Sequence, residues 1–277
     1  AFAALKDDGS VITWGNSSNG ADSSSVSHQL SSGVTQIFST RQSFAALKDD
    51  GSVVTWGDGS AANASKVAPS LTSGVSQIFT TPDAFAALKD DGSVITWGNY
   101  GGDSSSVSAD LSSGVVQITS NERSFAALKD DGSVVTWGGF AIGADSAALS
   151  SGVSQISATG AVFAALKDDG SVITWGYSTP DYGGDISSVS DQLMSGVSQI
   201  FSNRHSFAAL KDDGSVITWG DSNNGGDSYS VSNELSSGVS QIFSTYKAFA
   251  ALKDDGSVVT WGNPTDGGDS SYVSSEL

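Results

Sequence analysis

One fourteen-residue sequence occurs seven times in this 277-residue chain, and it constrains the fold more than any other feature. It reads Phe-Ala-Ala-Leu-Lys-Asp-Asp-Gly-Ser-Val-(Ile/Val)-Thr-Trp-Gly, and only its eleventh position varies. The copies begin at Phe2, Phe44, Phe85, Phe125, Phe163, Phe207 and Phe249. Successive copies are therefore 38 to 44 residues apart, a period that fits the blades of a β-propeller better than short helical or leucine-rich repeats.

Each copy predicts a β-hairpin. In the second copy, residues 44–48 and 53–56 are short runs rich in aromatic and β-branched residues, and Asp49, Asp50 and Gly51 separate them. The glycine supplies the positive φ that a tight hairpin loop needs. We name the two hairpin strands B and C.

A second element, Ser-Gly-Val-x-Gln-Ile, predicts a third strand, which we name A. A link of only four or five residues joins it to the next strand B, so the two strands must be antiparallel. The element begins at Ser32, Ser73, Ser113, Ser151, Ser195 and Ser237. Serine-rich segments such as residues 104–108 give a weaker expectation of a fourth strand, because serine is a poor strand former.

The hairpin carries apolar residues on both faces, as expected for a small sheet packed between two similar sheets. Seven such sheets arranged radially bury those faces and leave few free edges. We therefore predict an all-β, seven-bladed β-propeller with repeats of about 40 residues and three to four antiparallel strands per blade. We expect residues 1–277 to form a single domain.

The repeat starts and stops out of phase with complete blades. Leu277 aligns with the leucine that precedes strand A in every other repeat, and the chain opens directly on a strand B. The first blade therefore lacks strand A, its innermost strand. We expect the native polypeptide to continue at one or both ends. The alternative is that another chain fills the gap by strand addition, so that the protein self-associates through its incomplete first blade.

The charge of the chain excludes several classes of partner. Thirty acidic residues against twelve Lys and Arg give a net charge of −18, which would repel nucleic acid and anionic membrane surfaces. There is no apolar run long enough to insert into a membrane. The absence of cysteine and the presence of only two histidines exclude a disulfide scaffold and a His-rich metal centre. We expect an extracellular or cell-surface bacterial protein.

Recurrent acids and tryptophans are the main candidates for special chemistry. The Asp-Asp-Gly turns gather at one end of the blades, and a further aspartate follows Gly-Gly or Gly-Ala in every blade but the second. These loop aspartates are Asp22, Asp103, Asp145, Asp185, Asp227 and Asp269. Weak calcium binding is one interpretation, but such short turns favour aspartates that cap their own backbone. We therefore predict no cofactor, and we expect the seven tryptophans to pack between blades rather than to stack on sugars.

The variable segments carry the candidate recognition residues. Strand direction places the A-to-B links and the start of each loop after strand C at the end opposite the Asp-Asp-Gly turns. Arg and Tyr, which are common at binding hot spots, recur there; the alternative is neutral drift of solvated loops. The predicted partner-binding residues are Arg41, Gln42, Tyr100, Glu122, Arg123, Phe140, Tyr177, Tyr182, Arg204, His205, Tyr246 and Lys247.

The segment Ala-Leu-Lys-Asp-Asp-Gly-Ser-Val-Ile-Thr-Trp-Gly, followed by a loop with Gly-Gly-Asp or Gly-Ala-Asp, resembles the regulator-of-chromosome-condensation repeat. This is a family of seven-bladed β-propellers. The Ser-Gly-Val-x-Gln-Ile element and the unit length are more similar to its secreted bacterial branch, which includes a β-lactamase-inhibiting propeller. The resemblance covers essentially the whole chain and implies the fold, whereas the family includes exchange factors, inhibitors and interaction modules.

These observations favour a non-enzymatic binding module that recognises a protein or a glycan through its variable loops. No Ser/His/Asp arrangement, phosphate-binding glycine loop or pair of contrasting acids indicates an enzyme. The alternative is a structural repeat unit of a bacterial cell-surface array or filament. A guanine-nucleotide exchange factor ranks lower, because the chain is acidic and lacks a basic tail.

Overall fold

A computed structural model describes residues 1–59, 61, 63–139, 147–177 and 180–273, and the chain forms two compact units. Unit 1 comprises Ala1–Asp130 with Val135–Gly139, and unit 2 comprises Asp131–Val134 with Phe140–Leu277. Each unit has its own sheets and its own buried core. That residues 1–277 form a single domain stays a prediction.

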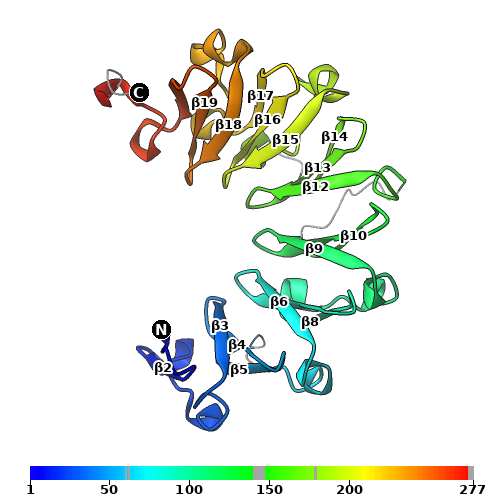
Figure 1. Cartoon of the computed structure of the whole chain (residues 1–277), viewed down its shortest axis with the longest axis vertical. Coiled ribbons are helices and arrows are strands. Elements are labelled where there is room, and N and C mark those ends of the chain that lie inside the picture. Colours follow the sequence, from blue (N-terminus) through cyan, green and yellow to red (C-terminus); the bar gives the residue numbers. More distant parts are fainter. Residues whose placement is uncertain (60, 62, 140–146, 178–179, 274–277) are drawn as a thin grey trace. The chain divides into compact units, whose positions relative to one another are not determined.

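The sheets follow the repeat, one for each copy of the hairpin (Figure 1). In unit 1 the strands are β1 (Phe2–Leu5) with β2 (Val11–Trp14), β3 (Val34–Ser39) with β4 (Ser43–Lys48) and β5 (Val53–Gly57), β6 (Val75–Thr80) with β7 (Ala84–Lys89) and β8 (Val94–Gly98), and β9 (Val115–Ser120) with β10 (Ser124–Lys129) and β11 (Val134–Gly138). In unit 2 they are β12 (Val153–Ala158) with β13 (Val162–Lys167) and β14 (Val172–Gly176), β15 (Val197–Ser202) with β16 (Ser206–Lys211) and β17 (Val216–Gly220), and β18 (Val239–Ser244) with β19 (Ala248–Lys253) and β20 (Val258–Gly262). Numbered in chain order as blades 1 to 7, these sheets give an all-β, seven-bladed β-propeller fold class.

The pairing register is the same in every complete blade. In blade 2, Ser39 lies opposite Phe44 and Gln36 lies opposite Leu47, and a β-bulge follows between Gln36 and Val34. The bulge leaves the intervening Thr35 unpaired, and its hydroxyl donates to the carbonyl of Leu47 at 3.1 Å. That carbonyl therefore faces strand A, as do the backbone groups of every second residue along strand B.

Each complete blade has three strands among the described residues, the lower of the two numbers predicted, and no fourth strand forms at residues 104–108. Short 3-10 helices occupy the loops instead. They are η1 (Ser17–Asn19), η2 (Ser24–Val26), η3 (Ala68–Leu71), η4 (Tyr100–Gly102), η5 (Ser105–Val107), η6 (Asp110–Ser112), η7 (Pro180–Tyr182), η8 (Ser190–Leu193), η9 (Ser222–Asn224), η10 (Tyr229–Val231), η11 (Glu234–Ser236), η12 (Pro264–Asp266) and η13 (Ser271–Val273). Serine and aspartate side chains bond their local backbone in these loops and compete with strand pairing.

The core lies between consecutive blades, as the apolar residues on both hairpin faces predicted. Ala45 and Leu47 of blade 2 pack in one buried cluster with Phe85 and Trp97 of blade 3. The Phe and Trp rings of each hairpin also stack on one another, with centroids 5.1 Å apart for Phe85 and Trp97. Blades 2, 3 and 6 therefore each contribute one face to the cluster before them and one to the cluster after them.

Within the described residues the first blade has two strands, and the predicted absence of its strand A from this sequence is confirmed. Its aromatic side chains, whose equivalents in blade 3 pack against blade 2, are exposed. Phe2 is 65% exposed and Trp14 is 50% exposed, whereas Phe85 and Trp97 at the same positions of blade 3 are 0% and 4% exposed. Within the described residues no helix has the length and apolar character needed to cross a membrane.

Candidate functional site

The two ends of each blade carry different residues, as the strand directions predicted. At one end, the backbone amide of Asp49 donates to the carbonyl of Gly33 at the start of strand A, at 2.9 Å. At the other end, the amide of Asp58, directly after strand C, donates to Gln42 in the A-to-B link, also at 2.9 Å. We call the first end the turn rim, since it holds the Asp-Asp-Gly turns, and the second the link rim.

Aspartates of the turn rim cap their own backbone. In blade 2, Asp50 Oδ1 accepts a hydrogen bond from the amide of Ser52 at 2.9 Å, and the equivalent bond forms in all seven turns. In blade 1, hydrogen bonds from the hydroxyl and amide of Ser10 and from Lys6 lower the pKa of Asp8 to about 2. The predicted turn-capping role is confirmed.

The turn glycine is needed for contact between blades as well as for the turn itself. Gly51 has φ +73°, and a Cβ there would lie 2.7 Å from the backbone nitrogen of Gly74 in the next blade. Its carbonyl accepts a hydrogen bond from the amide of Val75, at the start of strand A in that blade. Only glycine combines this backbone conformation with so close an approach.

The repeated lysine and tryptophan also have structural roles. Lys48 Nζ donates to the carbonyl of Gln29 at 3.1 Å, which pins the segment leading into strand A of the same blade. Trp137 is 3% exposed, and its Nε1 donates to the carbonyl of Gly101 in the preceding blade at 3.0 Å. Packing between blades, the predicted role of the tryptophans, is confirmed for the buried members of the series.

The loop aspartates cap turns as well. Asp103 Oδ1 accepts a hydrogen bond from the amide of Ser105 at 3.0 Å, and in blade 2, where no aspartate occurs, Asn63 accepts from Ser65 at 3.1 Å. The amide side chain therefore performs the same function as the carboxylate. Asp145 lies outside the described residues.

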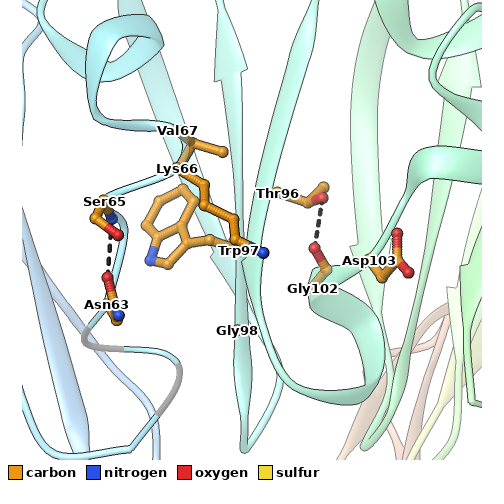
Figure 2. A pocket seen from close by; sticks show the side chains of 9 residues that line it. All are labelled: Asn63, Ser65, Lys66, Val67, Thr96, Trp97, Gly98, Gly102 and Asp103. Carbon is orange, nitrogen blue, oxygen red and sulfur yellow. Dashed lines mark hydrogen bonds between the residues drawn. The ribbon is translucent and has the colours of Figure 1, made fainter.

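The unusual loop of blade 2 forms one side of a hollow that the sequence did not predict (Figure 2). The hollow has a volume of about 470 Å³ and is lined by Lys66 from this loop and by Trp97 and Asp103 from blade 3. Hydrogen bonds from Ser105, together with the charge of Lys66, lower the pKa of Asp103. The departure of residues 61–66 from the repeat is the sequence signal that marks this place.

On the link rim of unit 1, the predicted residues form separate pairs. Arg41 donates to Asp83 Oδ2 at 2.8 Å, so its charge is neutralised by the next link. Arg123 lies over the ring of Tyr100, 5.0 Å from its centroid. Gln42 is exposed, and Glu122 beside Arg123 is half-buried. Sequence reasoning missed the role of Asp83.

On the link rim of unit 2, five predicted residues come together. Tyr182 stacks on His205 with centroids 5.5 Å apart, and His205 meets the ring of Tyr246 edge-on at 5.9 Å. The guanidinium carbon of Arg204 lies 5.3 Å from the centroid of Tyr246, and Lys247 Nζ lies 5.8 Å from it. We call Tyr182, Arg204, His205, Tyr246 and Lys247 the rim cluster.

Backbone hydrogen bonds hold the links of unit 2 in place. The amide of Gly160 donates to the carbonyl of Arg204 at 2.8 Å, and the amide of Arg204 points to the carbonyl of Tyr246 at 3.4 Å. Tyr177 is 47% exposed at the start of the loop after β14. Phe140, the remaining predicted residue, lies outside the described residues. The links that carry the cluster are thus bonded to one another through their backbones.

Among the described residues, no group of three or more His, Asp or Glu side chains is arranged to hold a metal ion.

The strand-A glutamines include one with a clear structural role. Gln155 donates to the carbonyl of Ile200 at 2.6 Å and accepts from its amide at 3.1 Å, so it satisfies the backbone of a neighbouring blade.

No family model and no curated protein sequence matches the chain. Among solved structures, the CRINKLY WD40 ectodomain of the Arabidopsis thaliana receptor kinase ACR4 is 13% identical, with a TM-score of 0.46, and the match covers 94% of this chain and 92% of that one. Yeast RCC1 (Prp20), solved bound to Kap60, is 15% identical with a TM-score of 0.48, over 84% of this chain and 70% of that one. A second structure, of Prp20p from Saccharomyces cerevisiae, is 18% identical with a TM-score of 0.46, and the match covers 80% of this chain and 70% of that one. That structure was reported together with the binding of Prp20p to Gsp1p and histones. The family expected from the repeat is therefore among the structural neighbours.

Proposed function

We propose that this protein is a non-enzymatic binding module that recognises a protein or a glycan through the link rim, with the rim cluster of unit 2 as its main contact. The observation that carries the proposal is the convergence of five side chains from three blades. Tyr182 follows strand C of blade 5, Arg204 and His205 belong to the link of blade 6, and Tyr246 and Lys247 belong to the link of blade 7.

The chemistry of the rim cluster suits recognition. Tyr246 is 52% exposed, although it already contacts a histidine ring and two cations. Aromatic rings held by neighbours lose little conformational entropy on binding, and Tyr and Arg are enriched at binding hot spots. The cluster also brings together Arg204, His205 and Lys247 in a chain whose net charge is −18. It therefore differs in charge from the rest of the molecule.

The cluster differs from the turn rim in what its residues do. On the turn rim the second aspartate of each turn caps its own backbone, and Lys48 and its equivalents in blades 3 to 7 donate to a backbone carbonyl. In the rim cluster the rings and the cationic groups instead contact one another, and Tyr246 remains 52% exposed. An exposed constellation supported by its own packing is what a preformed binding surface requires.

Arrays of immobilised glycans and of purified proteins, screened with the wild-type chain, would test the proposal. The double variant Tyr182→Ala with Tyr246→Ala should lose at least about tenfold in affinity for any ligand found, as expected for the loss of hot-spot contacts. The control is Tyr229→Ala, since Tyr229 is 85% exposed in unit 2 and lies outside the cluster. Equal binding by the double variant and the control would contradict the assignment to this surface.

An extracellular or cell-surface bacterial location fits this proposal. The chain is acidic and contains no cysteine, so its folding does not depend on whether the compartment is reducing or oxidising. Fractionation of the source cells with an antibody against the chain would test the location, and recovery in the cytoplasm alone would contradict it.

A further inference from the structure

The hollow beside the loop of blade 2 has a counterpart elsewhere in the chain. Between blades 6 and 7, a hollow of about 350 Å³ is lined by Asp227 and Ser230 from the loop of blade 6 and by Gly262 from blade 7. Counted back from the leucine that precedes strand A, these two loop residues occupy the positions of Asn63 and Lys66 in blade 2. The two hollows therefore occur at the same place in the repeat and differ in the side chains that line them.

The loop of blade 2 departs from the repeat at both of these positions. Where blade 2 has Asn63, the loops of blades 1, 3, 5 and 6 have an aspartate, namely Asp22, Asp103, Asp185 and Asp227. Where blade 2 has Lys66, the same four loops have a serine, namely Ser25, Ser106, Ser188 and Ser230. Each change makes the loop more positive by one charge, so blade 2 brings a cation to a place where the other loops are acidic.

The opposite side of the hollow carries a negative charge. Lys66 extends from the loop of blade 2, and Asp103 belongs to the loop of blade 3 (Figure 2). No ion pair within 4.0 Å joins them in the described part of the chain. They are nevertheless close enough that, after the hydrogen bonds from Ser105, the charge of Lys66 contributes to lowering the pKa of Asp103. The two charges therefore face each other with space between them.

Both charged groups keep bonding capacity for a ligand. Asp103 accepts from the amide of Ser105 at 3.0 Å, which uses only part of the capacity of a carboxylate. Lys66 Nζ has three donors and bonds no described residue, whereas Lys48 and Lys89 each donate to a backbone carbonyl. The repeated lysines thus hold the fold together, and Lys66 does not.

Trp97 and Val67 add apolar surface to the lining of the hollow. Trp97 is 4% exposed, and its Nε1 donates to the carbonyl of Ala61 at 3.1 Å. The ring is therefore held in place before any ligand arrives, so its ordering adds no cost to binding.

We propose that this hollow binds a small zwitterion, an α-amino acid with an apolar side chain, whose carboxylate pairs with Lys66 and whose ammonium group pairs with Asp103. The apolar side chain of the ligand lies against Trp97 and Val67. The volume of about 470 Å³ falls in the range of small-molecule sites.

Charge selects a zwitterion over a simple ion. An anion would pair with Lys66 but would meet the like charge of Asp103 and the net charge of −18 of the chain. A cation would pair with Asp103 but would meet the like charge of Lys66. A zwitterion satisfies both groups and carries no net charge. The hollow lies in unit 1 and the rim cluster in unit 2, so either proposal can fail without the other.

The first experiment titrates L-leucine into the wild-type chain and follows the NMR signals of the Trp97 indole N–H and of the Gly98 and Gly102 amides. We expect saturable shifts at these groups, with a Kd of about 1 mM or lower. N-acetyl-L-leucine lacks the ammonium group and L-leucine amide lacks the carboxylate. Each should bind at least about tenfold more weakly, because it loses one charged pair. No saturable shift with L-leucine, or equal binding of all three compounds, would overturn the proposal.

Two variants each remove one charge and leave the fold intact. Lys66 is exposed, and Asp103→Asn keeps the turn because Asn63 caps the equivalent turn of blade 2. Lys66→Gln and Asp103→Asn should each bind L-leucine at least about tenfold more weakly. The matched control Lys247→Gln makes the same change of charge in unit 2 and should bind like the wild type. Wild-type affinity in Lys66→Gln, or an equal loss in Lys247→Gln, would overturn the proposal.

Combining variants with derivatives assigns each end of the ligand to its partner. Lys66→Gln should bind L-leucine and L-leucine amide with similar affinity, because the group that distinguishes them has lost its partner. Asp103→Asn should in the same way lose the preference for L-leucine over N-acetyl-L-leucine. A variant that keeps the full preference of the wild type would show that the ligand group binds elsewhere, and would overturn the proposal.

Discussion

The turn rim and the link rim belong to the same strands, yet they use their residues in opposite ways. At the turn rim, Gly51 lies so close to the backbone of the next blade that a Cβ atom would be 2.7 Å from the nitrogen of Gly74. No residue with a side chain fits there. At the link rim, Arg41 in blade 2 and Arg204 in blade 6 occupy the same position of their A-to-B links. Arg41 pairs with Asp83, whereas Arg204 lies over the ring of Tyr246. The difference shows that repetition is fixed where blades meet through backbone and relaxed where side chains meet each other or solvent.

The sharpest way to break this comparison is a glycine substitution at the turn rim. A Cβ at Gly214 would lie 2.7 Å from the nitrogen of Gly238, whereas a Cβ at Gly256 in the last blade would meet no atom within 4 Å. Both residues have positive φ, so each alanine variant costs about 1 to 2 kcal/mol of backbone strain. Gly214→Ala should cost roughly 1 to 3 kcal/mol more, since the adjacent strand must move. Urea denaturation measures both, and equal losses would contradict the role assigned to the contact between blades.

A buried tryptophan should give the next largest effect. Trp137→Phe removes the donor to the buried carbonyl of Gly101 and should lower the free energy of unfolding by about 2 kcal/mol. Trp14→Phe is the matched control, because Trp14 is 50% exposed and should lose no more than about 0.5 kcal/mol. Thermal melting compares the two, and similar shifts would mean that the hydrogen bond between blades contributes nothing.

The link rim should tolerate a far more drastic change. The combined variant Arg41→Ala, Arg123→Ala, Arg204→Ala and Tyr246→Ala removes one exposed ion pair and two cation–ring contacts, each worth about 0.5 to 1 kcal/mol or less. Its melting temperature should fall less than that of Gly214→Ala alone. A larger fall would show that these side chains hold the blades together.

Acid should produce the smallest effect, through the capping aspartates. Hydrogen bonds to Ser105, assisted by Lys66, lower the pKa of Asp103 from its ordinary value of 3.8. The folded state thus favours the carboxylate, and its contribution is present above pH 3.8 and lost as the pH falls through the lowered pKa. Asp103→Asn retains the acceptor, as Asn63 shows, but does not titrate. The stability difference between wild type and variant should narrow from pH 5 to pH 2 in urea denaturation, and a constant difference would contradict the capping role of the charge.

The sequence predicted the features that depend on local chemistry and on the repeat. The hairpins, the capping aspartates, the buried tryptophans and the missing strand of blade 1 follow from residues near each other or in phase. The weaker fourth strand does not form at residues 104–108 because the loop bonds its own backbone there, through η5 and the hydrogen bond from Ser105 to Asp103. A β-propensity argument does not weigh that local competition.

The rim cluster could be predicted only in part. Its five residues were identified one by one from the variable links and loops, but the stacking of Tyr182 on His205 depends on how far the loop after β14 reaches toward blade 6. The neutralisation of Arg41 by Asp83 depends likewise on the distance between two links. Such distances are set by the packing of neighbouring sheets and leave no pattern within a single repeat.

The hydrogen bond between each turn and the following blade has a consequence for the order of folding. The carbonyl of Gly9 accepts a hydrogen bond from the amide of Val34, and the carbonyl of Gly51 accepts one from the amide of Val75. Each of these bonds therefore joins residues only about 25 positions apart in the chain. Contacts of such short range close quickly. As the polypeptide leaves the ribosome, each hairpin can be locked by the next stretch to emerge, and assembly can advance one blade at a time without waiting for the end of synthesis.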